Sequence, residues 1–85
     1  MRTWPAWWDW DLELSAHLLE RMIMRDFNEI EVRHMLSVVS RLRPDGLPGR
    51  WIAECRWRRR PWEVIVEPDE VAQVLIVITA YPADR

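Results

Sequence analysis

The sequence contains no lysine, so all twelve basic side chains are arginines, and fourteen acidic side chains bring the formal net charge to −2. A charge this small excludes a protein that binds nucleic acid through an overall basic surface. The charges are unevenly placed, because residues 41–60 hold seven arginines and only two acids. This basic centre between acidic flanks indicates a local anion site, although a GC-rich genome would produce the same preference for arginine.

Cysteine and glycine are almost absent. A single cysteine cannot form an intramolecular disulfide, and Cys55 lies in an apolar pattern, which is typical of a protein in a reducing compartment. Gly46 and Gly49 are the only glycines, too few for a glycine-rich phosphate loop. His17 and His34 are the only histidines, so the chain lacks the usual ligands of a zinc site, and we expect no metal ion and no cofactor.

Long apolar runs are absent too. No run approaches the roughly 18 residues of a membrane-spanning helix. The N-terminus lacks the basic region and aliphatic stretch of a signal peptide. At 85 residues the chain has the length of one domain. We therefore expect a soluble, cytoplasmic protein with no membrane partner.

The strongest structural signal is an alternation of apolar and charged residues over 50–67, which predicts an antiparallel β-hairpin. The run Arg59-Arg60-Pro61 interrupts the alternation and marks the turn. One face of the hairpin would carry charge. The other would pack on the core, with Trp51, Ala53, Cys55, Trp57, Trp62, Val64 and Val66.

Two helices and a further strand complete the predicted fold. Ser15 can cap a helix that begins at Ala16, and Asn28 can cap a second one. Residues 40–49 read as a loop, and residues 74–81 as a central strand with Val74, Ile76, Ile78 and Ala80 facing the helices. The prediction is an α+β fold: two N-terminal helices packed on one face of a small antiparallel sheet of three to four strands, with 12–14 as the optional edge strand. The stripes expected to be buried are Leu18, Leu19, Met22 and Ile23 in the first helix, and Ile30, Val32, Met35, Leu36 and Val39 in the second.

A tryptophan-rich arm over residues 1–11 precedes the domain predicted for 12–85. Four exposed tryptophans would favour aggregation, so the arm must pack on something. It either folds over its own core or forms a docking strip for a partner or a second copy of the chain. The residues concerned are Trp4, Trp7, Trp8 and Trp10.

The charged face of the predicted hairpin is where we place a candidate site. Glu54 is a candidate general base, and nearby arginines would favour its ionised form and bind phosphate. His17 can exchange a proton near neutral pH, and the last strand adds Thr79 and Tyr81 to the same face. The alternative is a solvated ion-pair face without chemistry. The arginines proposed for phosphate binding are Arg21, Arg58 and Arg60, with Arg56 beside Glu54.

Three stretches of the chain resemble a small bacterial family of uncharacterised domains that is itself similar to the RelE- and BrnT-type toxins. They are His17-Leu-Leu-Glu-Arg21-Met-Ile-Met-Arg25, Gly49-Arg50-Trp51 with Glu54 and Arg56, and Thr79-Ala80-Tyr81-Pro82. The resemblance implies a RelE-like domain of the barnase–EndoU–colicin–RelE fold. It also implies a metal-independent endoribonuclease, the toxin of a toxin–antitoxin pair, with RNA and a cognate antitoxin as partners. The catalytic residues would be His17, Glu54, Arg56, Thr79 and Tyr81. The alternative is a non-catalytic protein- or RNA-binding module, and a homodimer is compatible with either.

Overall fold

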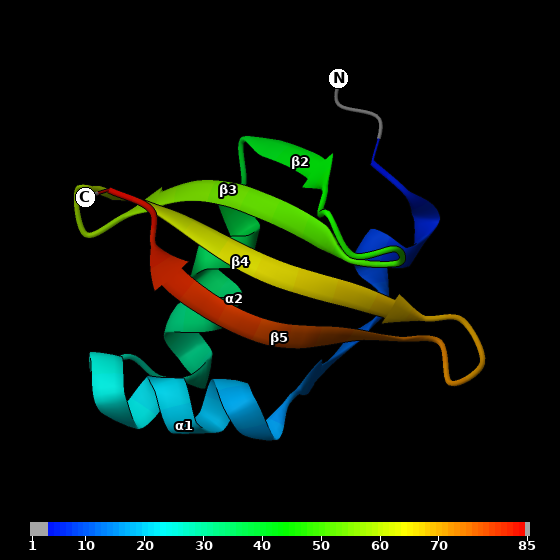
Figure 1. Cartoon of the computed structure of the whole chain (residues 1–85), viewed down its shortest axis with the longest axis horizontal. Helices are drawn as coiled ribbons and strands as arrows, with labels where there is room; N and C mark the ends of the chain where they lie inside the picture. Colours follow the sequence, from blue (N-terminus) through cyan, green and yellow to red (C-terminus); the bar gives the residue numbers. More distant parts are fainter. Residues whose placement is uncertain (1–3, 85) are drawn as a thin grey trace.

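The computed structural model describes residues 4–84, which form two helices and a five-stranded mixed sheet (Figure 1). The strands lie in the order β1-β5-β4-β3-β2. β1 runs parallel to β5, and the other pairs are antiparallel. The elements are η1 (Ala6–Asp9), β1 (Asp11–Leu14), α1 (Ala16–Arg25), α2 (Glu29–Ser37), β2 (Arg41–Pro44), β3 (Trp51–Trp57), β4 (Arg60–Asp69) and β5 (Val74–Pro82).

The α+β class, the two helices and the β3–β4 hairpin are confirmed, but the predicted strand number and the all-antiparallel sheet are wrong. β1 was expected only as an optional edge strand, and it pairs in parallel with β5, from which both helices and the strands β2, β3 and β4 separate it in the sequence. β2 lies in the segment predicted as a loop. It forms because its backbone pairs with residues 51–54, and Leu42 packs against the core.

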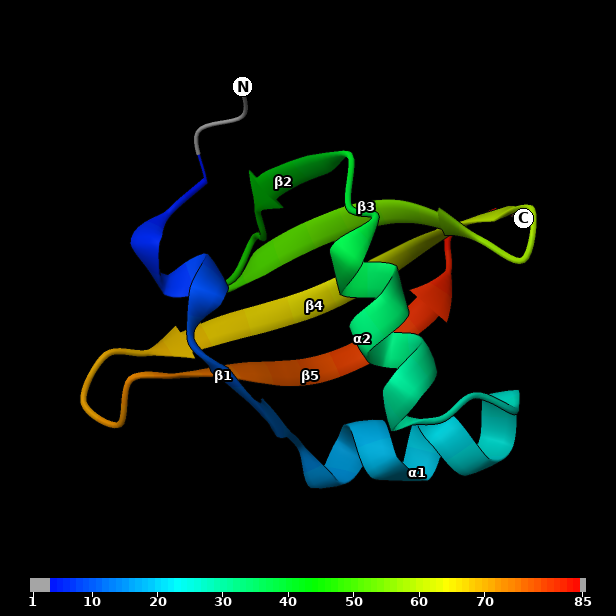
Figure 2. The same ribbon diagram turned by 180° about the vertical axis from the view of Figure 1, so that it is seen from behind.

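Both helices begin at the predicted caps. The Ser15 hydroxyl accepts a hydrogen bond from the Leu18 backbone N–H at 3.0 Å. Asn28 and Glu31 form a reciprocal capping box, with distances of 2.9 and 3.1 Å. Asp26, with a φ of 56°, ends α1 in the left-handed conformation. α2 lies over one face of the sheet, whereas α1 lies along the β5 edge of that face (Figure 2).

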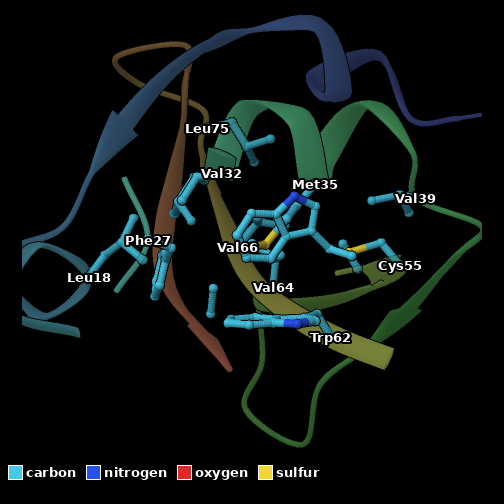
Figure 3. Close-up of a cluster of buried hydrophobic side chains, with 14 residues drawn as sticks. Leu18, Phe27, Val32, Met35, Val39, Cys55, Trp62, Val64, Val66 and Leu75 are labelled. Carbon is cyan, nitrogen blue, oxygen red and sulfur yellow. The ribbon is translucent and has the colours of Figure 1, made fainter. Parts of the chain in front are cut away.

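The core fills the space between the helices and this face of the sheet (Figure 3). Burying large apolar side chains such as Leu18 contributes about 1.5–3 kcal/mol each. The sequence predicted more buried residues in each helix than the structure contains. Leu19, Ile23 and Ile30 were expected to be buried but are 49%, 86% and 79% exposed. Since α1 packs at the sheet edge rather than on the sheet centre, only a narrow strip of it meets the core. The buried residues that line the core are Leu18, Phe27, Val32, Met35, Val39, Ala53, Cys55, Trp57, Trp62, Val64, Val66, Leu75, Val77 and Ala80.

The predicted orientation of β5 is wrong in its first half. Leu75 and Val77 face the core, and Val74 and Ile76 do not. The cause is a β-bulge, since the pairing steps from Ile65 with Thr79 to Val66 with Val77. One extra residue in β5 inverts the alternation there. The second half of the strand keeps the expected phase, which leaves its polar side chains on the face without helices.

Candidate functional site

The face of the sheet opposite the helices carries one connected set of polar side chains. Glu54, Glu63 and Tyr81 lie side by side in register across β3, β4 and β5. Arg43 donates from Nε to Glu54 Oε2 at 2.5 Å and from Nη2 to Glu63 Oε2 at 3.0 Å. The Tyr81 hydroxyl donates to Glu63 Oε1 at 2.7 Å. We call these four residues the open-face network.

Arg43 makes this arrangement of carboxylates stable. Like charges directly opposite one another on neighbouring strands are unfavourable, and Glu54 and Glu63 are such a pair. The guanidinium lies between them and bonds to both. The hydrogen bond with Glu54 and the charge of Glu63 raise the pKa of Arg43. The network therefore places two carboxylates around one cation.

Tyr81 is held in its protonated form. Burial, and then the hydrogen bond and charge of Glu63, raise its pKa to about 12. The charge of Asp45, in the turn after β2, raises the pKa of Tyr81 as well. At neutral pH Tyr81 is consequently a hydrogen-bond donor and not a base.

The arginine that forms an ion pair with Glu54 is Arg43, which is not one of those predicted from the hairpin. Arg58 lies in the turn after β3, where it stacks over Trp57 at 4.0 Å and donates to Glu31 Oε2 at 2.6 Å. Arg60 pairs with Asp84 at 2.8 Å. Two of the three predicted phosphate ligands, Arg58 and Arg60, are thus engaged in ion pairs away from Glu54. Sequence analysis missed Arg43 because β2 was taken for a loop.

Arg56 keeps the position predicted for it, on the same side of β3 as Glu54. Its side chain is exposed and donates to the Arg59 carbonyl at 3.1 Å. Within residues 4–84 it forms no ion pair. Its charge is therefore available to a ligand.

A second group of polar residues follows α1 along the edge of β5. His17, Arg21 and Arg25 are spaced four residues apart, so they form one row on the helix. Arg25 fixes the direction of the row, because its Nη1 donates to the Ala80 carbonyl at 2.9 Å. Thr79 and Tyr81 flank that carbonyl in the sequence. We call His17, Arg21 and Arg25 the α1 row.

The α1 row carries unneutralised positive charge. In the part of the chain that the structure describes, neither Arg21 nor Arg25 forms an ion pair. Arg21 Nε donates to His17 Nε2 at 3.3 Å, so this nitrogen carries a lone pair. Arg25 was not among the predicted site residues. Its place four residues after Arg21 was the signal that could have identified it.

The predicted convergence of His17 on Glu54 does not occur. Glu54 is on β3, and both β4 and β5 separate it from α1. The carboxylate next to the last strand is instead Glu63, which bonds Tyr81. The predicted residues therefore divide into two groups. His17 and Arg21 belong to the α1 row, and Glu54 and Tyr81 belong to the open-face network.

Cys55 faces the core as predicted and is 3% exposed. Burial raises the pKa of its thiol to about 11. A thiol that is protonated at neutral pH is a poor nucleophile. Cys55 therefore contributes to packing.

The N-terminal arm packs on its own domain. Trp7 lies 5.5 Å from Trp51, and Trp4 stacks on Trp8 at 5.3 Å between ring centroids. All four tryptophans of the arm contact the core while remaining partly exposed. Of the two alternatives given for the arm, the structure therefore shows the first, in which the arm folds over its own core. A docking role for its exposed parts stays a prediction.

Residues 4–84 contain no group of three histidine, cysteine or acidic side chains close enough to hold a metal ion. Over the same described range, no helix is long and apolar enough to cross a membrane. No protein-family model matches this chain, and comparisons with curated proteins and with solved structures found no similar protein. The resemblance to RelE- and BrnT-type toxins therefore stays a prediction that rests on the residues quoted for it.

Proposed function

We propose that this protein is a metal-independent endoribonuclease whose phosphate site is the edge of β5, between the α1 row and Tyr81. The observation that supports this proposal is the α1 row itself. It combines a histidine with two arginines that have no acidic partner in residues 4–84, beside a strand end with two hydroxyl groups. Arginine binds phosphate well because its planar donors match two phosphate oxygens.

The chemistry needs a base for the 2′-hydroxyl, cations for the phosphate and a proton donor for the leaving oxygen. His17 Nε2 takes the proton of the 2′-hydroxyl once Arg21 turns from the imidazole to the phosphate. Arg21 and Arg25 offset the negative charge that develops on the non-bridging phosphate oxygens. Tyr81 donates toward the leaving 5′-oxygen, which its pKa of about 12 permits because the hydroxyl keeps its proton at neutral pH. The products would be a 2′,3′-cyclic phosphate and a 5′-hydroxyl.

The role as the toxin of a toxin–antitoxin pair is part of this proposal. A cognate antitoxin would block RNA from the β5 edge. The partly exposed tryptophans of the arm and the exposed Leu19 and Ile23 on α1 offer apolar contacts for such a partner.

The test is incubation of the pure protein with RNA in EDTA. We expect His17→Ala to lower the cleavage rate by about 100-fold or more, the usual contribution of general acid–base catalysis. His34→Ala is the matched control, because His34 is the other histidine of the chain and is exposed on α2, outside the α1 row. A wild-type protein without cleavage would refute the enzyme, and His17→Ala with full activity would refute the α1 row.

The second candidate is a non-catalytic RNA- or protein-binding module. It is favoured by the open-face network, because Arg43 already engages both Glu54 and Glu63 and leaves neither as an unpaired base. RNA that binds in a strongly salt-dependent manner without cleavage would support this candidate. Binding that is insensitive to salt but lost on deletion of residues 1–10 would indicate a protein partner.

A further inference from the structure

A pocket lies between the N-terminal arm and α2, on the face of the sheet that the helices cover (Figure 2). Its volume is about 240 Å³. Pockets for drug-sized ligands begin at about 300 Å³, so this one suits a small molecule or ion. Neither the α1 row nor the open-face network contributes a residue to the lining, so the pocket is separate from the proposed ribonuclease site.

The walls of the pocket are mostly aromatic and apolar. Trp8 and Trp10 line it from the arm. One leucine each from β1, α2 and β5 completes the apolar lining, namely Leu12, Leu36 and Leu75. The ring of Trp8 is held in place because it stacks on Trp4, with 5.3 Å between the ring centroids. Both lining indoles are partly exposed, so a ligand can reach them.

The charge at the pocket is negative. Asp9 lies between the two lining tryptophans in the sequence and also lines the pocket. Within residues 4–84 its carboxylate has no ion-pair partner. Arg33 lines the pocket as well, but its Nε donates to Glu29 Oε2 at 3.1 Å. Glu29 therefore offsets the charge of Arg33, and Asp9 leaves one negative charge without a partner.

Indole rings beside an unpaired carboxylate favour an organic cation as the ligand. A cation over the face of an aromatic ring is attracted by the ring quadrupole, and tryptophan attracts it most strongly. An anion would instead meet the Asp9 carboxylate and the negative faces of the rings. The ligand that suits this pocket is therefore positively charged.

The lining also distinguishes between kinds of ammonium ion. A primary ammonium ion has three N–H donors, and among indoles and leucines most of them would lose water without gaining an acceptor. A quaternary ammonium ion has no N–H donor, and its methyl groups suit apolar walls. Its charge needs only the ring faces and a nearby carboxylate.

We propose that this pocket binds a small quaternary ammonium ion, with Trp8 and Trp10 against the methylated nitrogen and Asp9 balancing its charge. Because the arm already packs on the core, the ligand need not order the arm when it binds. This inference goes beyond the proposed function and does not depend on it. The ribonuclease proposal assigns no role to the pocket.

The experiment titrates the whole protein with three ligands that share one hydroxyalkyl frame. They are choline, its neutral carbon analogue with a tert-butyl group in place of trimethylammonium, and ethanolamine. The indole N–H resonances of Trp8 and Trp10 report binding in NMR spectra, and those of the buried Trp57 and Trp62, which lie outside the pocket, serve as internal controls. We expect choline to bind about tenfold more tightly than either of the other two ligands, the size of one desolvated cation–π contact.

Two variants test the sign of the charge that the pocket prefers. Asp9→Asn should weaken choline binding about threefold, as expected for a partly screened charge pair. Asp11→Asn is the matched control, because Asp11 is the next exposed acid along the chain but does not line the pocket. Arg33→Gln should strengthen choline binding, because it removes the positive charge from the lining.

Unmoved Trp8 and Trp10 resonances in choline would overturn the inference, and so would equal affinity for the neutral analogue or for ethanolamine. An Asp9→Asn variant that binds choline as well as wild type would overturn it too. Weaker choline binding in Arg33→Gln would indicate an anion site and have the same consequence. None of these measurements depends on RNA cleavage, so the two proposals fail on different experiments.

Discussion

Tyr81 is the only tyrosine in the chain, so the ultraviolet absorbance of tyrosinate reports its titration alone. We expect a pKa of about 12 in the folded protein and the ordinary value of 10 in urea. Burial is the largest cause, followed by the hydrogen bond and charge of Glu63. A rapid pH jump would record the titration before the protein unfolds.

The raised pKa predicts how stability depends on pH. Because the folded state holds the proton more tightly, the contribution is fully present below pH 10 and is lost as the pH rises toward 12. A rise from 10 to 12 corresponds to at most ~2.7 kcal/mol. Solvent screening at this partly exposed side chain reduces that to about 1 kcal/mol. Urea denaturation of wild type and Tyr81→Phe at several alkaline pH values would measure it, since Tyr81→Phe should lack this loss.

Substitutions of the residues around Tyr81 test the direction in which each residue shifts the pKa of Tyr81. Glu63→Gln should lower the pKa of Tyr81 but leave it above 10, because burial remains. Arg43→Met should raise it, since the arginine charge acts in the opposite direction. Glu67→Gln should leave it unchanged. A wild-type Tyr81 that titrates at its ordinary value, or an Arg43→Met variant with a lowered pKa, would refute the open-face network as described.

Two further predictions concern stability, measured by urea denaturation. Arg59 has a φ of 62° in the β3–β4 turn, a conformation that costs a non-glycine residue about 1–2 kcal/mol. Arg59→Gly should therefore stabilise the protein by about 0.5–1 kcal/mol after the entropic cost of glycine, whereas Arg59→Gln should not; a loss of stability in Arg59→Gly would contradict this. Leu18→Ala should cost about 2–5 kcal/mol because Leu18 is fully buried, and Ile23→Ala, at 86% exposure, less than about 0.5 kcal/mol. Equal losses of stability in Leu18→Ala and Ile23→Ala would contradict the packing of α1 described above.

The parts of the fold that depend on local side-chain patterns could be predicted from the sequence. The β3–β4 hairpin follows from alternation, and both helix starts follow from Ser15 and Asn28. The β5 bulge could not be predicted, because that run is apolar on both faces. Its sequence therefore does not show which residues face the core. β2 has one apolar residue among Arg41–Pro44, and its pairing with β3 forms only in the folded sheet.

In the candidate site too, local patterns identified residues, whereas their grouping depends on the folded structure. Spacing along α1 identified His17 and Arg21, and strand phase identified Glu54, Thr79 and Tyr81. Their grouping was wrong because it depends on where α1 packs relative to the sheet. Arg43 reaches Glu54 only through β2, so no pattern within the hairpin could indicate it.

The position of the α1 row follows from the short length of β1. β1 pairs with β5 only as far as Val77, and β5 continues to Pro82 with an unpaired edge. Exposed edges invite pairing with other chains. Here the Ser15 hydroxyl donates to the Ile78 carbonyl at 2.7 Å, and Arg25 donates to that of Ala80. The helix that protects the edge therefore also brings His17 and Arg21 beside it. An Arg25→Met variant should thus lose phosphate binding and also expose the edge, so we expect it to associate more readily than Arg21→Met, which light scattering would detect.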